Sequence, residues 1–212
     1  GQYTFGAILN TDKVIPLKAK KDGAMIGKLV IDSLEPDIEY DLIDYIKGGL
    51  KLNLTYAIDF SASNGPASSI MSLHHISKRH NIKNDYQTAL DSITDVLLHY
   101  DSDRTIYAYG YAAMVNDKPS NFFSITFDPK VTEIKNKADL LSYYEKAVAK
   151  VELFGPTRFA PIIKAVKEKA LEAFDINKWN YSVLIILTDG LINEYCNPCD
   201  AIHGGRRIEV SL

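Results

Sequence analysis

Five oxygen-bearing side chains, spread over three separate loops, are the residues of this sequence whose types and spacing indicate chemistry. Asp59, Ser61 and Ser63 stand in the segment Asp-Phe-Ser-Ala-Ser, directly after an apolar stretch. Thr157 ends the segment Phe-Gly-Pro-Thr, and Asp189 lies in Thr-Asp-Gly after a second apolar stretch. Because hard divalent cations prefer oxygen donors, this set suits Mg²⁺, or Mn²⁺ in its place.

The charge of this donor set indicates what such an ion would bind. Two carboxylates only neutralise a dication, and the three hydroxyl groups add lone pairs without adding charge. The ion would therefore stay electrophilic, with a coordination position open for the Asp or Glu of a protein partner. Each motif alone has a simpler explanation as a turn or a helix cap, so the prediction depends on the three occurring together.

The elements that must position these loops alternate between strands and helices from about residue 42 onward. Apolar runs predict strands over residues 50–60, 105–111, 122–127 and 181–188. Apolar residues at helical spacing predict helices over 86–97, 140–151 and, with Pro161 at the first helical position, 161–174. This alternation predicts a doubly wound, mostly parallel α/β sheet flanked by helices, with its functional loops at the carboxyl ends of the strands. In extended backbone, Asp59, Ser61 and Ser63 would point to one side.

The first 40 residues differ from the rest of the chain. Alternating apolar residues predict strands over 3–9 and 25–31, separated by a basic turn region that contains Lys18, Lys20 and Lys21. Two strands bury too little apolar surface to be stable alone. We therefore expect residues 1–40 to be part of an incomplete β-domain, or two strands that lean on the main domain at 41–212. Residues 207–212 are expected to begin one further strand.

Composition excludes several classes of protein. With 46% hydrophobic and 24% charged residues, the chain is neither disordered nor a collagen or coiled coil. A net charge of −3 provides no field that would recruit nucleic acid. The longest apolar run, at 181–187, is far shorter than the roughly 20 residues that span a bilayer. Cys196 and Cys199 are the two cysteines, too few for a disulfide framework.

Whole stretches of the sequence resemble a known family. The three loops together resemble the metal-ion-dependent adhesion site of von Willebrand factor A domains. Longer segments look like a copine, namely residues 44–49, 57–65, 72–76, 100–104, 155–163 and 186–190. The resemblance runs from about residue 42 to at least 192. A complete domain of this type is expected to continue beyond the fifth strand with a further helix and strand. The stretch 201–207 is shorter than expected for the connection between the fourth and fifth strands.

The resemblance implies a function and a set of ligands. It implies a metal site formed by Asp59, Ser61, Ser63, Thr157 and Asp189, in a protein-binding module that is not an enzyme. Copines carry two C2-type lipid-binding β-sandwiches before this domain, so residues 1–40 would be the last strands of the second one. A cytoplasmic protein that calcium recruits to phospholipid membranes is implied, with Ca²⁺ bound by C2-type domains largely outside this chain. The acidic calcium-binding loops of such a domain are not evident in residues 1–40.

Two alternatives for the oxygen-rich site remain open. Asp59 would be the nucleophile of a metal-dependent phosphatase or phosphoryl-transfer enzyme, but that chemistry generally needs a second acid two residues on, where Ser61 stands. A second alternative is a vacant site in a domain that binds partners by its surface alone. His74 and His75 are expected to be loop or helix-surface residues rather than catalytic bases.

Two further groups of residues have ordinary structural explanations. Cys196 and Cys199 form a C-x-x-C pair. The pair is only half of a zinc site, and a redox pair would open a helix directly after a strand. We expect two thiols in a loop or in a first helical turn. Tyr107, Tyr109 and Tyr111 share one face of a predicted strand. We expect them to pack against a helix rather than to stack on nucleic acid bases.

Overall fold

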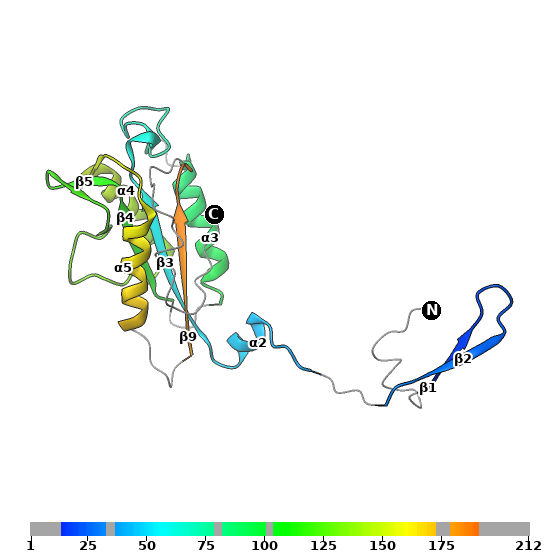
Figure 1. Cartoon of the computed structure of the whole chain (residues 1–212). Helices are drawn as coiled ribbons and strands as arrows, with labels where there is room; N and C mark the ends of the chain where they lie inside the picture. Colours follow the sequence, from blue (N-terminus) through cyan, green and yellow to red (C-terminus); the bar gives the residue numbers. More distant parts are fainter. Residues whose placement is uncertain (1–13, 33–36, 79–81, 101–103, 173–178, 191–212) are drawn as a thin grey trace. The chain divides into compact units, whose positions relative to one another are not determined.

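A computed structural model of the chain describes residues 14–32, 37–78, 82–100, 104–172 and 179–190 (Figure 1). Contacts divide the chain into two units, Gly1–Asp41 and Leu42–Leu212. The strands predicted over 3–9 and 207–212, together with Cys196 and Cys199, lie outside the described residues. In the described parts of the chain, no helix is both long and apolar enough to cross a membrane.

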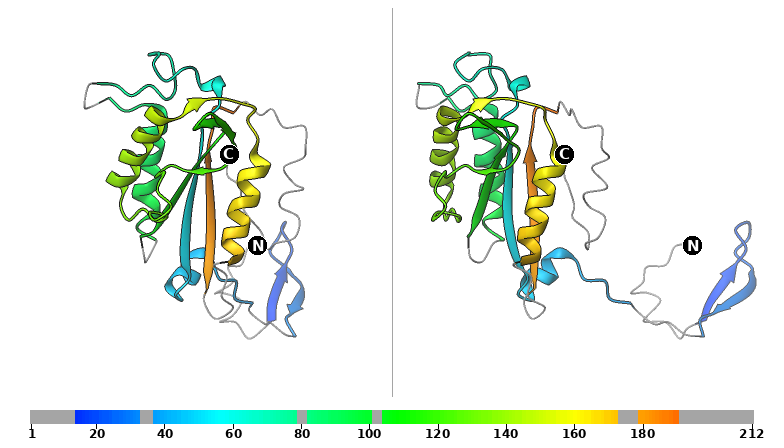
Figure 2. Two further views of the ribbon diagram at one scale, coloured as in Figure 1. Left: turned by 90° about the vertical axis from the view of Figure 1, so that its left-hand side faces the viewer. Right: turned by 60° about the vertical axis from the view of Figure 1, so that its left-hand side comes forward.

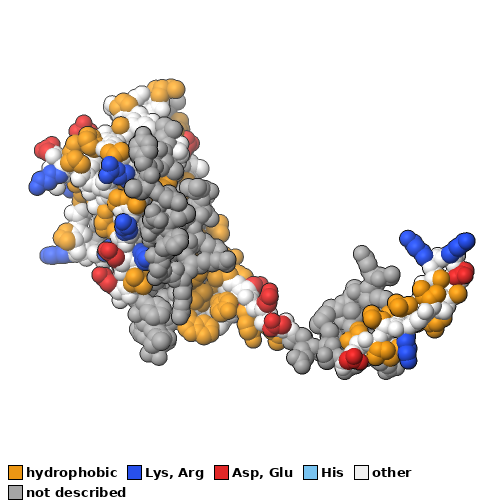
Figure 3. All heavy atoms as spheres, in the orientation of Figure 1, with side chains coloured by type: hydrophobic (Ala, Val, Ile, Leu, Met, Phe, Trp, Pro, Cys, Tyr) orange, Lys and Arg blue, Asp and Glu red, His pale blue; other side chains and the backbone are white. Residues whose placement is uncertain are grey.

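The first unit contains an antiparallel hairpin of β1 (Val14–Lys18) and β2 (Met25–Val30). Strand β1 was not predicted, and Lys18, expected in the turn, ends it. Pro16 obscured the strand signal, since proline is tolerated only in edge strands. Lysine side chains gather at the turn end of the hairpin (Figure 3). Apolar side chains on both strands are exposed, with Met25 and Ile26 each 68% exposed.

The second unit is built on a sheet with the strand order β7-β4-β3-β9 (Figures 1 and 2). Its strands are β3 (Lys51–Asp59), β4 (Ile106–Tyr111), β7 (Phe123–Ser124) and β9 (Asn180–Leu187). Strand β3 pairs in parallel with both β4 and β9, which confirms the predicted α/β class. The strand predicted over 122–127 is shorter and runs antiparallel to β4. It ends early because the Ser124 and Thr126 hydroxyls bond each other at 2.9 Å as the chain turns.

In the described part of the chain, three helices cover this sheet, on both of its faces. Helices α3 (Asp85–Leu97) and α4 (Lys137–Lys150) lie on one face, and α5 (Phe159–Glu172) lies on the other (Figure 2). Pro161 is the third residue of α5 rather than its first. The position is tolerated because amides in the first turn have no partner within the helix. Alternate residues of β3 face the two layers: Tyr56 and Ile58 pack toward α3 and α4, and Ala57 packs toward α5.

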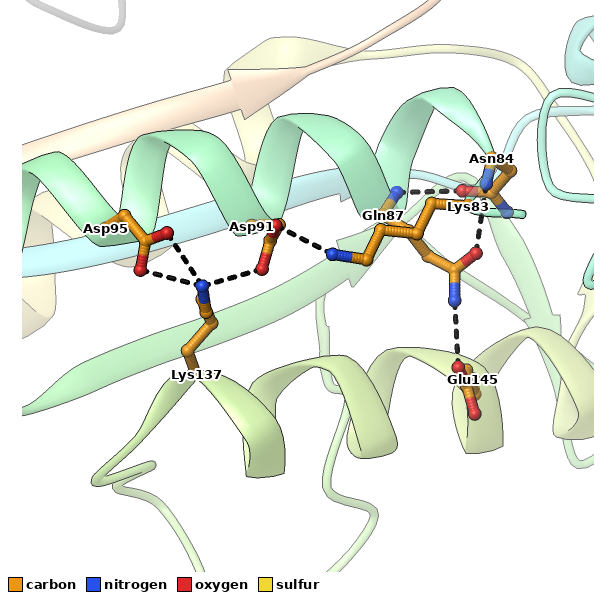
Figure 4. Close-up of polar contacts among 7 residues, drawn as sticks. All are labelled: Lys83, Asn84, Gln87, Asp91, Asp95, Lys137 and Glu145. Carbon is orange, nitrogen blue, oxygen red and sulfur yellow. Dashed lines mark hydrogen bonds and ion pairs between the residues drawn. The ribbon is translucent and has the colours of Figure 1, made fainter. Parts of the chain in front are cut away.

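Polar side chains join α3 to α4 along their exposed sides. Figure 4 shows Lys137 of α4 between Asp91 and Asp95 of α3, with Nζ 2.8 Å and 2.7 Å from their carboxylate oxygens. Further along the two helices, the Gln87 amide donates to Glu145 at 2.8 Å. These contacts fix how the helix pair lies over the sheet.

Several short elements were not predicted. They are α2 (Leu42–Lys47), the 3-10 helix η1 (Ala62–Asn64), and a small sheet of β6 (Lys118–Ser120), β5 (Ala113–Val115) and β8 (Glu152–Leu153). The β5–β6 turn is formed by Asn116 and Asp117, whose φ angles of 50° and 61° are typical of a two-residue hairpin. Strand β8 connects α4 to the loop that contains Thr157.

Candidate functional site

Asp59 is the last residue of β3 and is fully buried at the carboxyl end of the sheet. Its Oδ1 accepts a hydrogen bond from the Ser61 amide at 2.8 Å, and its Oδ2 accepts one from the Thr188 hydroxyl at 2.7 Å. Burial raises the pKa of the Asp59 carboxyl, and the nearby charge of Asp189 acts in the same direction. Two carboxylates in this setting repel each other, so a cation between them would be strongly favoured.

The Ser61 and Ser63 hydroxyls lie beside each other, with their oxygens 2.8 Å apart. They converge because η1 turns the chain after Ser61, and not because the segment is extended as predicted. Asn64, which the sequence analysis did not single out, holds this turn. Its amide donates to the Ser61 carbonyl at 3.2 Å and to the Ser61 hydroxyl at 3.1 Å, while its Oδ1 accepts from the Tyr86 hydroxyl at 2.7 Å. An Asn directly after the Ser-Ala-Ser segment was the available signal.

The loop that contains Thr157 is fastened to the loop after β3. The Phe154 amide donates to the Phe60 carbonyl at 3.1 Å, and Phe154 also forms an isolated parallel bridge with Ser61. Thr157 follows three residues later, is buried, and lies two residues before α5, as predicted. The second predicted loop therefore lies against the first.

The third loop follows β9, which ends at Leu187. Asp189 lies two residues further on and is close enough to influence the pKa of Asp59. A cavity of about 550 Å³ adjoins this loop, lined by Thr188 and Asp189 and by residues at the starts of α3 and α5, including Tyr86 and Phe159. The structure thus brings all three predicted loops to one edge of the sheet. Metal ligation by the five residues stays a prediction.

His74 is buried in the site, whereas we expected a loop or helix-surface residue. It does lie in a loop, but its ring stacks between Phe60 and Tyr86, with centroids 4.9 Å and 4.2 Å away. Its Nε2 lies 2.6 Å from the Asp59 carbonyl oxygen, and its Nδ1 lies 2.9 Å from the Tyr144 hydroxyl. Since a carbonyl only accepts, Nε2 carries the proton and Nδ1 accepts from Tyr144. Burial lowers the pKa of His74 to about 4, so the ring is neutral at pH 7.

The donor types at this edge fit a hard divalent cation. Among the described residues, no three His, Cys, Asp or Glu side chains gather into one group. An ion here would therefore depend on hydroxyl oxygens as well as on Asp59 and Asp189. That mixture of carboxylate and hydroxyl oxygen is the chemistry that Mg²⁺ and Mn²⁺ accept.

The sheet, its two helical layers and its three convergent loops define a von Willebrand factor A-like α/β domain. The sequence model of the copine family matches residues 72–211, and the chain belongs to this family. Among solved structures, the chain is similar to proximal thread matrix protein 1 (PTMP1) from the mussel byssus, with 16% identity and a TM-score of 0.45. That similarity covers 73% of this chain, which spans 35% of the length of the mussel protein.

Proposed function

We propose that this copine domain is a divalent-metal-dependent protein-binding module. Mg²⁺, or Mn²⁺ in its place, would be held by Asp59, Ser61, Ser63, Thr157 and Asp189. The ion would accept the carboxylate of an Asp or Glu from a protein partner at its open position. The observation that carries this proposal is the contact of the buried Asp59 carboxylate with the turn that aligns the Ser61 and Ser63 hydroxyls.

The surroundings of Asp59 support binding rather than phosphoryl transfer. His74 is the imidazole in contact with Asp59, and both of its ring nitrogens are already engaged, one of them with the Asp59 carbonyl. With a pKa of about 4, this ring neither accepts nor donates a proton readily at pH 7. Ser61, at the position where a second acid would be needed, is occupied in holding the turn.

An exposed apolar loop beside the site supports a protein partner. Ile70 and Met71 are 81% and 87% exposed. Their loop is closed at its base by hydrogen bonds from the Leu73 amide to the Asn64 carbonyl and from the Ser72 hydroxyl to the Gly65 carbonyl. Hydrophobic side chains are accordingly visible at this end of the unit (Figure 3). A partner that offers a carboxylate to the ion would meet apolar surface next to it.

The rest of the proposal concerns the longer protein. Residues 1–40 would be the end of a C2-type β-sandwich, and the antiparallel hairpin with exposed apolar residues supports this, because such residues are normally covered by further strands. C2-type domains would bind Ca²⁺ and bring a cytoplasmic protein to phospholipid membranes. The metal-dependent module would then present its site to protein partners there.

Calorimetric titration of Mg²⁺ tests the site. Wild type should bind one ion, and Asp59→Ala should show no binding while keeping its far-ultraviolet circular dichroism spectrum. Asp128→Ala, which removes an exposed carboxylate from a distant turn, is the matched control and should bind as wild type does. Identical titrations of wild type and Asp59→Ala would contradict the assignment. Metal-dependent hydrolysis of a phosphate ester that Asp59→Asn abolishes would instead favour the enzymatic alternative.

A further inference from the structure

Three side chains lie in a row across the carboxyl ends of β9, β3 and β4. Asp59 and Tyr111 are register partners in the parallel β3–β4 pair, so their side chains point to the same face of the sheet. On the other side of β3, the Thr188 hydroxyl donates to the Asp59 carboxylate. The shared face is the one covered by α5, where Tyr111 packs edge-on against Phe159 with centroids 5.9 Å apart.

The hydroxyl of Tyr111 does not take part in this ring packing. Tyr111 is fully buried, and its hydroxyl makes no hydrogen bond within the described parts of the chain. The Asp59 carboxylate and the Thr188 hydroxyl lie beside it, but Thr188 already directs its proton to Asp59. Burial raises the pKa of Tyr111, so the phenol keeps its proton. A buried polar group without a partner destabilises the fold, so a partner is expected.

We propose that Tyr111 is a positioning residue of the metal site, and that its hydroxyl binds a water molecule held in the shell of the divalent ion. The inference rests on the proposed function. Mg²⁺ usually keeps several waters, and a water bound to a cation is a strong hydrogen-bond donor. The phenol oxygen of Tyr111 accepts from that water. Among the residues that line the cavity beside the site are Phe159 and Thr188, both neighbours of Tyr111.

A purely structural role of Tyr111 predicts a different effect of losing its hydroxyl. The aromatic ring fills the core between the sheet and α5, and phenylalanine would fill it equally well. If Tyr111 only packs, loss of its hydroxyl leaves metal affinity unchanged. If the hydroxyl serves the ion, its loss weakens metal binding and does not destabilise the metal-free protein, where the group has no partner.

The test compares Tyr111→Phe with wild type in the full chain, by calorimetric titration of Mg²⁺ and by urea unfolding without metal. We expect an Mg²⁺ dissociation constant about 3- to 10-fold higher, as for the loss of one hydrogen bond. Metal-free stability should be equal to that of wild type or greater. Tyr109→Phe is the matched control, because Tyr109 lies two residues earlier on the same strand and packs in the same cluster. It should bind Mg²⁺ as wild type does.

The possible results separate this inference from the proposed function. Equal affinities of Tyr111→Phe and wild type would overturn the role of the hydroxyl and leave the metal site standing. A loss of metal-free stability in Tyr111→Phe would also overturn it, since the hydroxyl would then have a partner within the fold. Absence of Mg²⁺ binding by wild type would overturn the proposed function and this inference together.

Discussion

The imidazole of His74 holds the backbone of Asp59, with Nε2 donating to the Asp59 carbonyl oxygen at 2.6 Å. The Asp59 carboxylate is held separately, by the Thr188 hydroxyl at the end of β9. The hydroxyl of Tyr144, a residue of α4, donates to Nδ1 of His74 and accepts from the Asn84 amide at 3.0 Å. The position of one carboxylate therefore depends on groups from both sides of β3.

His74→Phe should reduce both stability and metal affinity. Phenylalanine keeps the stack between Phe60 and Tyr86 but removes both hydrogen bonds, so the buried Asp59 carbonyl and Tyr144 hydroxyl lose a partner. We expect a loss of about 1–3 kcal/mol in the free energy of unfolding, measured with urea. Mg²⁺ binding should weaken as well. Tyr144→Phe removes only the outer bond and should affect Mg²⁺ binding less; an equal effect would contradict the direct role of His74.

Asn64→Ala should weaken metal binding more than it weakens the fold. The substitution removes the two donors that orient Ser61, and calorimetric titration should show a higher Mg²⁺ dissociation constant. Tyr86→Phe is a suitable control, because it deletes only the hydrogen bond to Asn64 Oδ1 and leaves the amide on Ser61. Should both variants bind Mg²⁺ equally well, Asn64 would not be the residue that orients the serine.

The buried pair of Tyr56 and Thr94 should make stability fall at alkaline pH. Their hydroxyl oxygens lie 2.8 Å apart, and burial raises the pKa of Tyr56 to about 12. An unfolded tyrosine ionises near pH 10. The unfolded state therefore releases its proton first, and stability that is complete below pH 10 is lost between about pH 10 and 12.

Tyr56→Phe isolates this effect. At pH 8 the variant should be less stable than wild type by about 1 kcal/mol, because Thr94 loses its partner. By pH 11 the difference should shrink by on the order of 1 kcal/mol, because the variant has no phenol to titrate at this position. Thr94→Val keeps the phenol and should keep the alkaline loss. Urea unfolding at both pH values measures this, and a constant difference between wild type and Tyr56→Phe would rule the effect out.

Gly110→Ala should destabilise the sheet at its β4–β7 edge. A Cβ atom at this position would lie far inside contact distance of Cζ of Phe123. The Phe123 ring would have to move, at a cost of about 1–3 kcal/mol in thermal or urea unfolding. Adding Phe123→Leu removes the obstructing ring and should recover part of the loss. No recovery in the double variant would show that the strain lies in the backbone instead.

The sequence predicted the α/β class and the order of the site loops because both depend on local patterns. Alternating and apolar runs locate β3 and β9 to within a residue or two. Asp59 is the last residue of β3, and Asp189 follows the end of β9. The burial of His74 could not be predicted, because it depends on rings from the loop after β3, from α3 and from α4 that meet only in the fold. The position of the Tyr111 hydroxyl could not be predicted either, because an aromatic ring in the core gives the same apolar pattern whatever its hydroxyl contacts.

The connection from Tyr144 through His74 to Asp59 has a consequence for pharmacology. Tyr144 is a buried residue of α4, far along the chain from Asp59. A small molecule that separated α4 from the sheet would break the Tyr144–His74 hydrogen bond and so weaken the one from His74 to the Asp59 carbonyl. If the proposed metal site exists, such a compound would lower its affinity for the ion without competing with it.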